Sequence, residues 1–266
     1  MADHGTALSA GDTMTKRQER IVELLSREGF VSVRNLKVHL GVSEMTVRRD
    51  LRVLADRDLV RLVHGGAALT HGTLRTPGFV NRAGVEADAK RIIADAARTF
   101  VRDGDTVTID AGTTTFALAE RLHDAAPHAV ITNSIPVVQL YLGRPAQRVV
   151  VLGGDVIPDS QAMVGSLSVA AVEHLRASTL FLGAAAVDSR GIYVETDIER
   201  PTKLAMMQSA DSVVLLCDAS KFEVSAPVRL STFVGIHVLI TDATPPASIR
   251  LAAEEAGTRI IVADRG

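Results

Sequence analysis

The arginines and hydroxyl side chains between positions 43 and 52 have the clearest potential for chemistry in this sequence. Ser43, Thr46, Arg48, Arg49 and Arg52 all fall in this short stretch. Arginine can donate two parallel hydrogen bonds to guanine O6 and N7, and serine or threonine hydroxyls can bond to phosphate or base. These residue types therefore predict a surface that contacts double-stranded DNA.

A helix over 44–55 would present those arginines to solvent. Val47, Leu51 and Leu54 recur at positions i, i+4 and i+7, which is the spacing of one buried helical stripe. With about 100° between successive residues, Arg49 and Arg52 lie opposite that stripe. A recognition helix in the major groove needs this division of faces. An amphipathic helix with solvated arginines has the same pattern, so the neighbouring elements must decide.

The elements expected on either side favour DNA binding. Helices are expected over 15–28 and 33–40, and after the helix over 44–55 come a strand over 59–63 and a tight turn over 64–67. Three helices and a hairpin are typical of a winged helix-turn-helix, which we place at 14–70. His64 in the turn could contact the DNA backbone or the minor groove. We expect Asp50, a negative charge within the recognition helix, to have its partner inside the protein.

Charge and composition agree with a basic DNA-binding part and an acidic body. Residues 14–70 carry eleven Lys and Arg against seven acids, whereas residues 71–266 carry eighteen against twenty-two. A basic surface favours contact with a polyanion. The single Cys excludes a disulfide within the chain, and neither a signal-like start nor an apolar stretch of about 18 residues is present, so we expect a soluble, cytoplasmic protein without membrane contact. The aromatic content of 3%, with no Trp, argues against an RNA-binding adaptor that stacks bases.

A second group of residues, rich in threonine, follows a predicted strand. The strand over 106–110 runs into Ala111-Gly112-Thr113-Thr114-Thr115, where a helix is expected to begin. Free backbone N–H groups and the positive end of the helix dipole make such a turn an anion site, and the hydroxyls add donors for phosphate. Threonines that only cap the helix are the structural alternative. The turn lacks a Walker A lysine and is not GxGxxG, which disfavours a nucleotide.

The chain after residue 85 predicts an α/β domain over 86–266. A linker over 71–85 joins it to the winged helix-turn-helix, and a disordered lead over 1–13 is expected at the start of the chain. Short Val, Ile and Leu runs alternate with helical stretches, which indicates an open, mainly parallel sheet covered by helices on both faces. The expected strands are 106–110, 129–132, 148–152, 179–184, 212–217, 236–241 and 259–263. The expected helices are 87–101, 114–123, 135–142, 166–176, 199–210 and 246–256.

Further polar turns are expected at the same edge of that sheet. Asn133 with Ser134 follows the second strand, and Gly153 follows the third. Parallel strands bring their carboxyl ends together, so these turns should lie near the threonine-rich one. Lys203 and Lys221 could supply cations there, although a single lysine is more often exposed to solvent.

A series of short motifs runs along the whole chain in a fixed order. Arg17 with Ile21 comes first, Ser43 with Thr46-Val47-Arg48-Arg49-Asp50-Leu51 second, and HGG from His64 third. DAGTTT, ITNS, LGG, FLGA, Glu199 with Lys203, and DASKF follow. At these residues, over roughly 16–242, the chain resembles the DeoR (deoxyribose operon repressor) family of bacterial transcription regulators. Leu62 departs from the family, which usually has a basic residue two positions before the histidine.

The resemblance implies a DNA-binding regulator, acting as a repressor, of a carbohydrate-metabolism operon. It implies a body similar in fold to ribose-5-phosphate isomerase, glucosamine-6-phosphate deaminase and CoA-transferase, with a phosphorylated sugar or related intermediate as effector and no cofactor. Operator DNA is then the partner, the chain forms a homo-oligomer (dimer or tetramer), and it is associated with the nucleoid when bound to DNA. The expected DNA contacts are Ser43, Thr46, Arg48, Arg49, Arg52 and His64. The expected effector contacts are Asp110, Gly112, Thr113, Thr114, Thr115, Asn133, Ser134, Gly153, Lys203 and Lys221.

The alternative function is a sugar-phosphate isomerase or deaminase with an attached DNA-binding head. Such an enzyme needs a general base beside the sugar carbon. The available carboxylates are Asp110, Asp188, Glu195 and Glu199. Ala185-Ala186 stand where the family commonly has Asp, Ser or Asn followed by Gly, which removes the most natural acid, so we expect no catalysis. The histidines show no metal-ligand spacing, and Cys217 lies in an apolar run where we expect a buried thiol.

Overall fold

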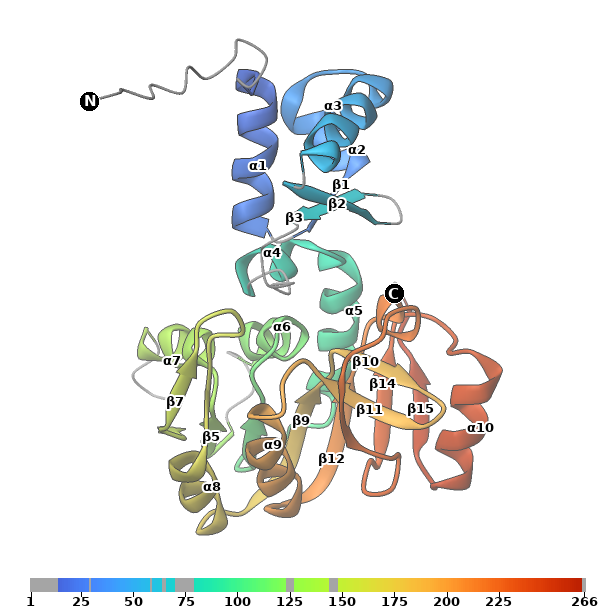
Figure 1. The fold of residues 1–266 in the computed structure, drawn as a ribbon. Helices are drawn as coiled ribbons and strands as arrows, with labels where there is room; N and C mark the ends of the chain where they lie inside the picture. The colour runs from blue at the N-terminus through green and yellow to red at the C-terminus, as the bar shows by residue number, and fades with distance from the viewer. Residues whose placement is uncertain are drawn as a thin grey trace, which may run out of the picture. The chain divides into compact units, whose positions relative to one another are not determined.

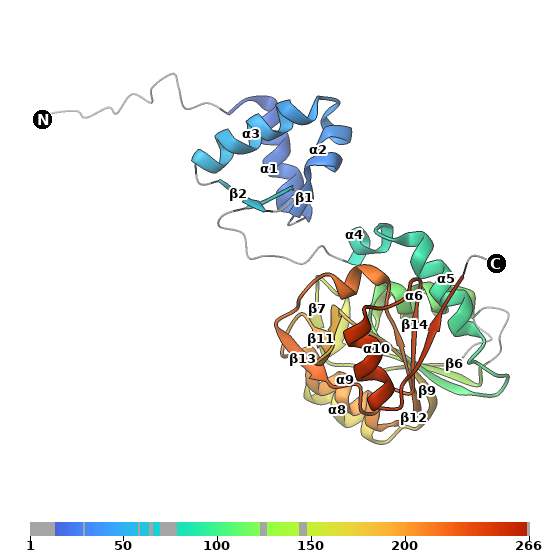
Figure 2. The ribbon, with the colours of Figure 1, turned by 90° about the vertical axis from the view of Figure 1, so that its right-hand side faces the viewer.

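The computed structural model describes residues 14–28, 30–57, 59–63, 66–69, 79–122, 127–143 and 148–264. The chain divides into two units, residues 1–78 and 79–266, each of which is described by itself (Figures 1 and 2). The expected disordered lead, His64 and the first part of the expected linker lie outside the described residues.

The described part of the first unit contains helices and a small antiparallel sheet, whose first strand lies between α1 and α2. Its elements are α1 (Lys16–Glu28), β1 (Phe30–Ser32), α2 (Val33–Leu40), α3 (Glu44–Asp56), β2 (Val60–Val63) and β3 (Gly66–Leu69). The strand order is β1-β3-β2, and both pairs are antiparallel. This arrangement confirms the expected winged helix-turn-helix. The sequence pattern did not predict β1, which is only three residues long.

Side-chain caps and a buried apolar stripe fix the helices of this unit. Ser32 Oγ accepts a hydrogen bond from the backbone N–H of Asn35 at 3.1 Å, which starts α2. Gly41 ends α2 with φ 64°, a left-handed conformation that glycine adopts without steric cost. Val47, Leu51 and Leu54 of α3 are buried in the core, as their spacing predicts.

The second unit is built on a parallel sheet. Among its described residues the strand order is β15-β14-β12-β9-β4-β5-β6, and every neighbouring pair is parallel. These strands are β4 (Thr106–Ile109), β5 (Ala129–Thr132), β6 (Arg148–Val151), β9 (Ala177–Gly183), β12 (Ala210–Leu216), β14 (Val238–Thr241) and β15 (Arg259–Val262). The expected strands lie at the same places within about two residues at each end.

Helices cover both faces of this sheet and enclose a separate core on each. The helices are α5 (Ala87–Arg98), α6 (Thr113–Arg121), α7 (Ile135–Leu142), α8 (Ser166–Glu173), α9 (Glu199–Gln208) and α10 (Ala247–Glu255). Ile109 of β4 and Leu118 of α6 belong to the core under α5, α6 and α7. Leu182 of β9 and Met206 of α9 belong to the core under α8, α9 and α10. The polar turns at the strand ends therefore rest on two packed layers.

Several short elements were not predicted. They are α4 (Phe79–Gly84), β7 (Asp155–Ile157), β8 (Ala162–Val164), β10 (Ala186–Asp188), β11 (Gly191–Val194), the 3₁₀ turn η1 (Ala219–Phe222) and β13 (Val228–Ser231). Helix α4 lies where we expected an aperiodic linker over 71–85, and the second unit begins at Phe79, the first residue of α4. Within the described chain, no helix combines the length and apolar character that crossing a membrane requires.

Candidate DNA-binding surface and anion site

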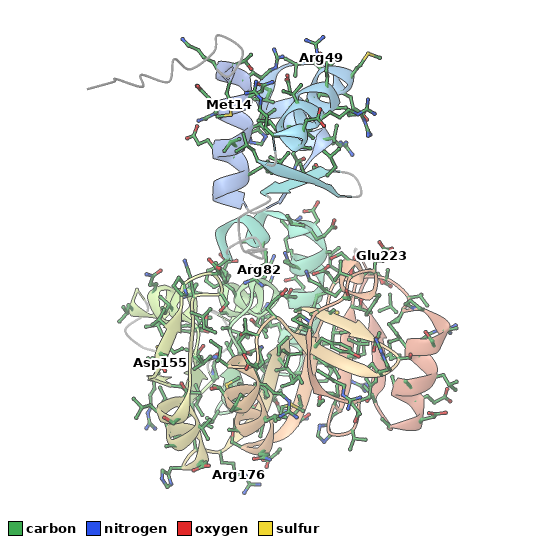
Figure 3. All side chains as sticks on the ribbon, in the orientation of Figure 1. Met14, Arg49, Arg82, Asp155, Arg176 and Glu223 are labelled. Carbon is green, nitrogen blue, oxygen red and sulfur yellow. The ribbon has the colours of Figure 1, made fainter. Side chains whose placement is uncertain are left out.

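Helix α3 presents its arginines to solvent. Arg48, Arg49 and Arg52 are exposed, and Met45 beside them is 81% exposed. Arg48 pairs with Glu44 one turn earlier at 2.7 Å. In the described chain Arg49 and Arg52 have no ion-pair partner, so their guanidinium groups are available to an external anion. Figure 3 labels Arg49 on this helix.

The two hydroxyls expected to contact DNA also cap α3. Ser43 Oγ accepts a hydrogen bond from the backbone N–H of Thr46 at 3.2 Å, and the Ser43 and Thr46 hydroxyl oxygens lie 2.9 Å apart. Both residues keep some exposure. A phosphate contact by either hydroxyl would have to share these groups with the cap.

Asp50 has the internal partner that we expected. Its side chain is 4% exposed and accepts two hydrogen bonds from Arg17, from Nε to Oδ2 at 2.5 Å and from Nη2 to Oδ1 at 3.1 Å. The two-pronged contact ties α1 to the buried side of α3. The charge of Asp50 is thereby neutralised within the protein, and the exposed Arg49 and Arg52 lie on the outer side of the same helix.

The carboxyl ends of β4 and β9 are joined by Asp110. Its Oδ2 accepts hydrogen bonds from the backbone N–H of Gly183 at 2.9 Å and from Nζ of Lys203 on α9. Lys203 Nζ also lies 3.4 Å from the Gly183 carbonyl oxygen. The Asp110 side chain is fully buried and that of Lys203 is 6% exposed. Lys203 is therefore a paired, buried cation. Asp110 Oδ1 is buried and has no hydrogen-bond partner among the described residues.

The N-terminus of α6 follows Asp110 directly. Thr115 Oγ1 donates to the Asp110 carbonyl at 2.6 Å, which locks the turn. No side chain caps the helix at Gly112, and the described chain offers the hydroxyls of Thr113 and Thr114 no hydrogen-bond partner. The first N–H groups of a helix without a cap, together with two free hydroxyls, are suited to an anion.

Asn133 and Ser134 fix the turn after β5. Asn133 Oδ1 accepts from the backbone N–H of Ala111 at 2.9 Å, and its Nδ2 donates to the carbonyl of Met163 on β8 at 3.2 Å. Ser134 Oγ accepts from the N–H of Val137 and caps α7. Both side chains therefore position neighbouring loops, and Asn133 does so next to the turn that contains Gly112.

Gly153 and Gly154 hold the turn after β6 against β8 and α8. Ser168 Oγ donates to the Gly153 carbonyl. Gly154 has φ +132°, and a Cβ at that position would lie 2.2 Å from the Val164 carbonyl oxygen and 2.5 Å from Ser168 Oγ. Only glycine fits there.

Glu199 lies near the Lys203–Asp110 pair, and the charge of Arg82, to which no motif pointed, acts on Glu199 in turn. Burial raises the pKa of the Glu199 carboxyl, Asp110 adds to the rise and Lys203 opposes it. Burial lowers the pKa of the Arg82 guanidinium, and the charges of Glu195, Glu199 and Asp159 oppose that shift. This edge of the parallel sheet, where the carboxyl ends of its strands lie, therefore combines cations with carboxylates that can accept hydrogen bonds from hydroxyl groups.

Lys221 lies at another part of the same edge, in the 3₁₀ turn after β12. Its charge acts on Lys90 and Cys217. The described structure gives it no hydrogen bond or ion pair with Asp110 or Lys203. Cys217 is 1% exposed, and burial raises the pKa of its thiol, which confirms the expected buried cysteine.

The side chains of Ala185 and Ala186 bring no polar group to this edge of the sheet. Ala186 begins β10 and is buried, and Ala185 binds Tyr193 through its backbone N–H at 2.9 Å. A search of the described residues for His, Cys, Asp and Glu gathered closely enough to hold a metal ion gives no such cluster.

Comparison with known proteins gives matches to both units. The model of the DeoR-like helix-turn-helix domain matches residues 17–73, and the model of the DeoR C terminal sensor domain matches residues 85–243. The chain is 32% identical over 236 residues to the glycerol-3-phosphate regulon repressor of Escherichia coli (strain K12), covering 88% of this chain and 93% of that protein. It is 34% identical over 247 residues to the HTH-type transcriptional regulator GlpR of Haloferax volcanii, covering 92% and 96%.

Among solved structures, the ribose 5 phosphate isomerase A of Neisseria gonorrhoeae is similar, with a TM-score of 0.37 and 20% identity, over 50% of this chain and 52% of that one.

Lys203→Met is expected to lower the free energy of unfolding by about 3–5 kcal/mol, because it leaves the buried Asp110 carboxylate unpaired. Lys203→Met with Asp110→Asn should lose less than the sum of the single changes. Urea denaturation followed by circular dichroism measures this double-mutant cycle. The exposed pair Arg176–Asp211 is the control, and breaking it should cost about 0–1 kcal/mol. Additive losses for Lys203 and Asp110 would contradict the coupling.

Glu199→Gln is expected to raise the free energy of unfolding at neutral pH. The pKa of Glu199 lies above its ordinary value of 4.5 in the folded state, so the folded chain binds its proton more tightly than the unfolded chain does. Stability therefore falls as pH rises from about 4.5 through the raised pKa, and the loss is complete above it. Gln keeps the acceptor for Thr196 without a charge. Urea titrations from about pH 4 to about pH 8 should show a gain that grows with pH. A gain in the free energy of unfolding that stays constant with pH would contradict a raised pKa of Glu199 as its cause.

Proposed function

Since the chain belongs to the DeoR family, we propose that it is a transcriptional repressor of a carbohydrate operon and that a phosphorylated sugar or polyol releases it from DNA. The observation that carries the proposal is the solvent-facing arginine row of α3, since the buried acid of this helix, Asp50, is neutralised inside the fold. Chromosomal DNA as partner implies a cytoplasmic protein that is associated with the nucleoid when bound.

The expected DNA contacts have distinct roles in this proposal. Arg49 and Arg52 read bases or phosphates from the middle of α3, because neither is engaged within the described chain. Arg48 is held by Glu44 and is better suited to a phosphate. Ser43 and Thr46, at the start of the helix, bind phosphate alongside their capping bonds. His64 remains a prediction, since it lies outside the described residues.

The effector site in this proposal is the edge of the sheet around Asp110. The free start of α6, with Thr113 and Thr114, receives the phosphate. Glu199 accepts hydrogen bonds from sugar hydroxyls, and the Lys203–Asp110 pair sets the positions of the loops that carry these groups. Asn133, Ser134 and Gly153 shape the neighbouring loops. Lys221 can reach only a ligand that extends toward the end of β12. The name of one relative supports a phosphorylated sugar or polyol as the ligand, because that relative is a glycerol-3-phosphate regulon repressor.

We propose that the second unit also makes the homo-oligomer, as a dimer or a tetramer. Leu167 on α8 is 71% exposed. Ile198 is 53% exposed and lines a hollow of about 620 Å³ together with Val164, Val169 and Pro201. Exposed apolar groups of this kind are typical of protein interfaces. A dimer would present two α3 helices to half-sites about one helical turn of DNA apart.

An effector lowers operator affinity only if it binds the free protein more tightly than the DNA-bound protein. Thermal melting should detect the free-protein complex, because a ligand that binds only the folded state raises the melting temperature. The panel is glycerol 3-phosphate, ribose 5-phosphate, glucose 6-phosphate and fructose 1-phosphate, each beside its unphosphorylated form, with inorganic phosphate as the minimal probe. We expect one phosphorylated compound to raise the melting temperature and its unphosphorylated form to do so less. An unchanged melting temperature with every compound contradicts a phosphorylated effector of this class.

The same incubations test the alternative enzyme function. Glu199 is the carboxylate in this region with the pKa shift expected of a general base. We expect no isomerised or deaminated product. Product that disappears in Glu199→Gln would establish catalysis instead.

Arg49→Ala is expected to weaken operator binding by about 1–3 kcal/mol, with the loss concentrated at one base pair if Arg49 binds a guanine. A phosphate contact would instead weaken all sequences alike and reduce the salt dependence by about 0.9 in log–log slope. Fluorescence anisotropy with an operator chosen by affinity selection measures both, and its stoichiometry counts the chains in the complex. Arg176→Ala removes an equal charge from the second unit and should have no effect. Equal binding by Arg49→Ala and the unmodified protein would overturn the role of this helix.

A further inference from the structure

Arg82 on α4 is a half-buried cation whose hydrogen-bonding capacity is not used up by the protein. Its Nε atom is buried and has no hydrogen-bond partner among the described residues. The charges that act on its guanidinium are the carboxylates of Glu195, Glu199 and Asp159. A guanidinium group has five N–H donors in a fixed plane and stays charged at all relevant pH values. A buried donor without a partner is costly, which favours an external acceptor at this place.

Helix α4 is attached to the second unit by a small number of contacts. The backbone N–H of Phe79 donates to the Asp159 carbonyl at 2.8 Å. The Phe79 ring meets the Phe116 ring edge-on, with centroids 5.6 Å apart. Lys90 Nζ donates to the carbonyl oxygens of Arg82 and Val85. A six-residue helix has no stability of its own, so the position of α4 depends on these contacts.

These contacts place α4 beside the candidate anion site. Phe116 lies in the first turns of α6, and its N–H bonds to the carbonyl of Gly112 at the helix start. Glu199, which acts electrostatically on Arg82, also interacts with Asp110 and Lys203. The ring contact of Phe79 with Phe116 and the electrostatic interaction of Arg82 with Glu199 therefore bring Arg82 to the region that contains the free start of α6 (Figure 3 labels Arg82).

We propose that Arg82 binds the phosphate of the effector and that this contact links ligand binding to the position of α4. The inference rests on the proposed function and adds a residue that no motif indicated. The planar guanidinium can donate two parallel hydrogen bonds to a phosphate, whereas Lys203 is already held by Asp110. When Arg82 turns to the phosphate, Glu195 and Glu199 are free to accept hydrogen bonds from the hydroxyls of the same ligand.

The link to DNA binding follows from the order of the chain. Helix α4 begins at Phe79, the first residue of the second unit, and the preceding residues lead to the helix-turn-helix unit. A ligand that holds α4 through Arg82 therefore acts on the segment through which the two units are joined. A ligand that contacts only the turn before α6 does not act on this connecting segment.

Arg82→Gln and Arg82→Lys test the proposal, with Arg91→Gln as the matched control. Arg91 lies on α5, is exposed and pairs with Asp88, so its loss removes the same charge outside the site. Calorimetric titration uses the compound that raises the melting temperature most, its unphosphorylated form and inorganic phosphate. We expect Arg82→Gln to weaken the phosphorylated compound by about tenfold or more and Arg82→Lys to weaken it less, because a lysine keeps the charge but not the two-pronged geometry. Binding of the unphosphorylated form should be unchanged, and the control should match the unmodified protein.

Hydrogen exchange at the backbone amides of α4 provides the second measurement. The phosphorylated compound should change exchange at Phe79 and Val85 in the unmodified protein and leave it unchanged in Arg82→Gln.

The outcomes separate this inference from the proposed function. Undiminished phosphate affinity in Arg82→Gln, while the unmodified protein responds to the ligand, overturns the role of Arg82 and leaves the function standing. Equal loss for phosphorylated and unphosphorylated forms assigns Arg82 a structural role and also overturns the inference. No binding of any panel compound or inorganic phosphate by the unmodified protein removes both.

Discussion

The buried ion pair between Lys203 and Asp110 is the contact on which the sensor unit depends. It joins the end of β4 to α9, and through the Gly183 backbone it also joins the end of β9. Burial of two charges is costly, so such a pair adds little net stability and chiefly fixes geometry. Here it fixes the turn from which α6 starts. The free N–H groups of α6, the Asn133 contact to Ala111 and the environment of Glu199 all follow from the position of that turn.

The DNA-binding unit uses the same physical device for a different purpose. Arg17 neutralises Asp50 on the inner side of α3, and the pair bridges α1 and α3. Asp50 would repel DNA phosphates if it faced outward, whereas in its paired and buried position it orients the helix. In both units a buried carboxylate with one basic partner sets the geometry, and the groups left over are those that can act on a ligand.

The sequence predicted the elements that have long, regular apolar patterns. The stripe of Val47, Leu51 and Leu54 and the Val, Ile and Leu strands were correct because burial alone determines them. The short strands β7, β8 and β10 were missed because three residues carry no periodicity. Helix α4 was missed because it lies in a stretch rich in Gly, Pro and Thr, and contacts with Phe116, Asp159 and Lys90 hold it in place.

The same reasoning explains what was predicted about the candidate site. The turn at Gly112 could be recognised, because a strand followed by small residues and hydroxyls is a local signal. The partner of Lys203 lies 93 residues away along the chain, and the carboxylates around Arg82 come from the turn between β7 and β8 and from the chain between β11 and the start of α9, so neither environment is visible before the chain is folded. Lys221 was expected near Lys203, but the 3₁₀ turn that carries Lys221 follows β12, and β12 and β4 are separated by β9.

Gly154 restricts which loops at this edge of the sheet can change in sequence during evolution. A side chain at that position would meet the Val164 carbonyl oxygen at 2.2 Å, so the turn after β6 is fixed in sequence and in path. Ala185 is partly exposed, and its backbone N–H rather than its side chain makes the hydrogen bond to the Tyr193 carbonyl that holds it in place. A lineage that changes ligands can therefore alter the loop after β9 and keep the loop after β6. New specificities would arise on one side of the site while the other side is inherited intact.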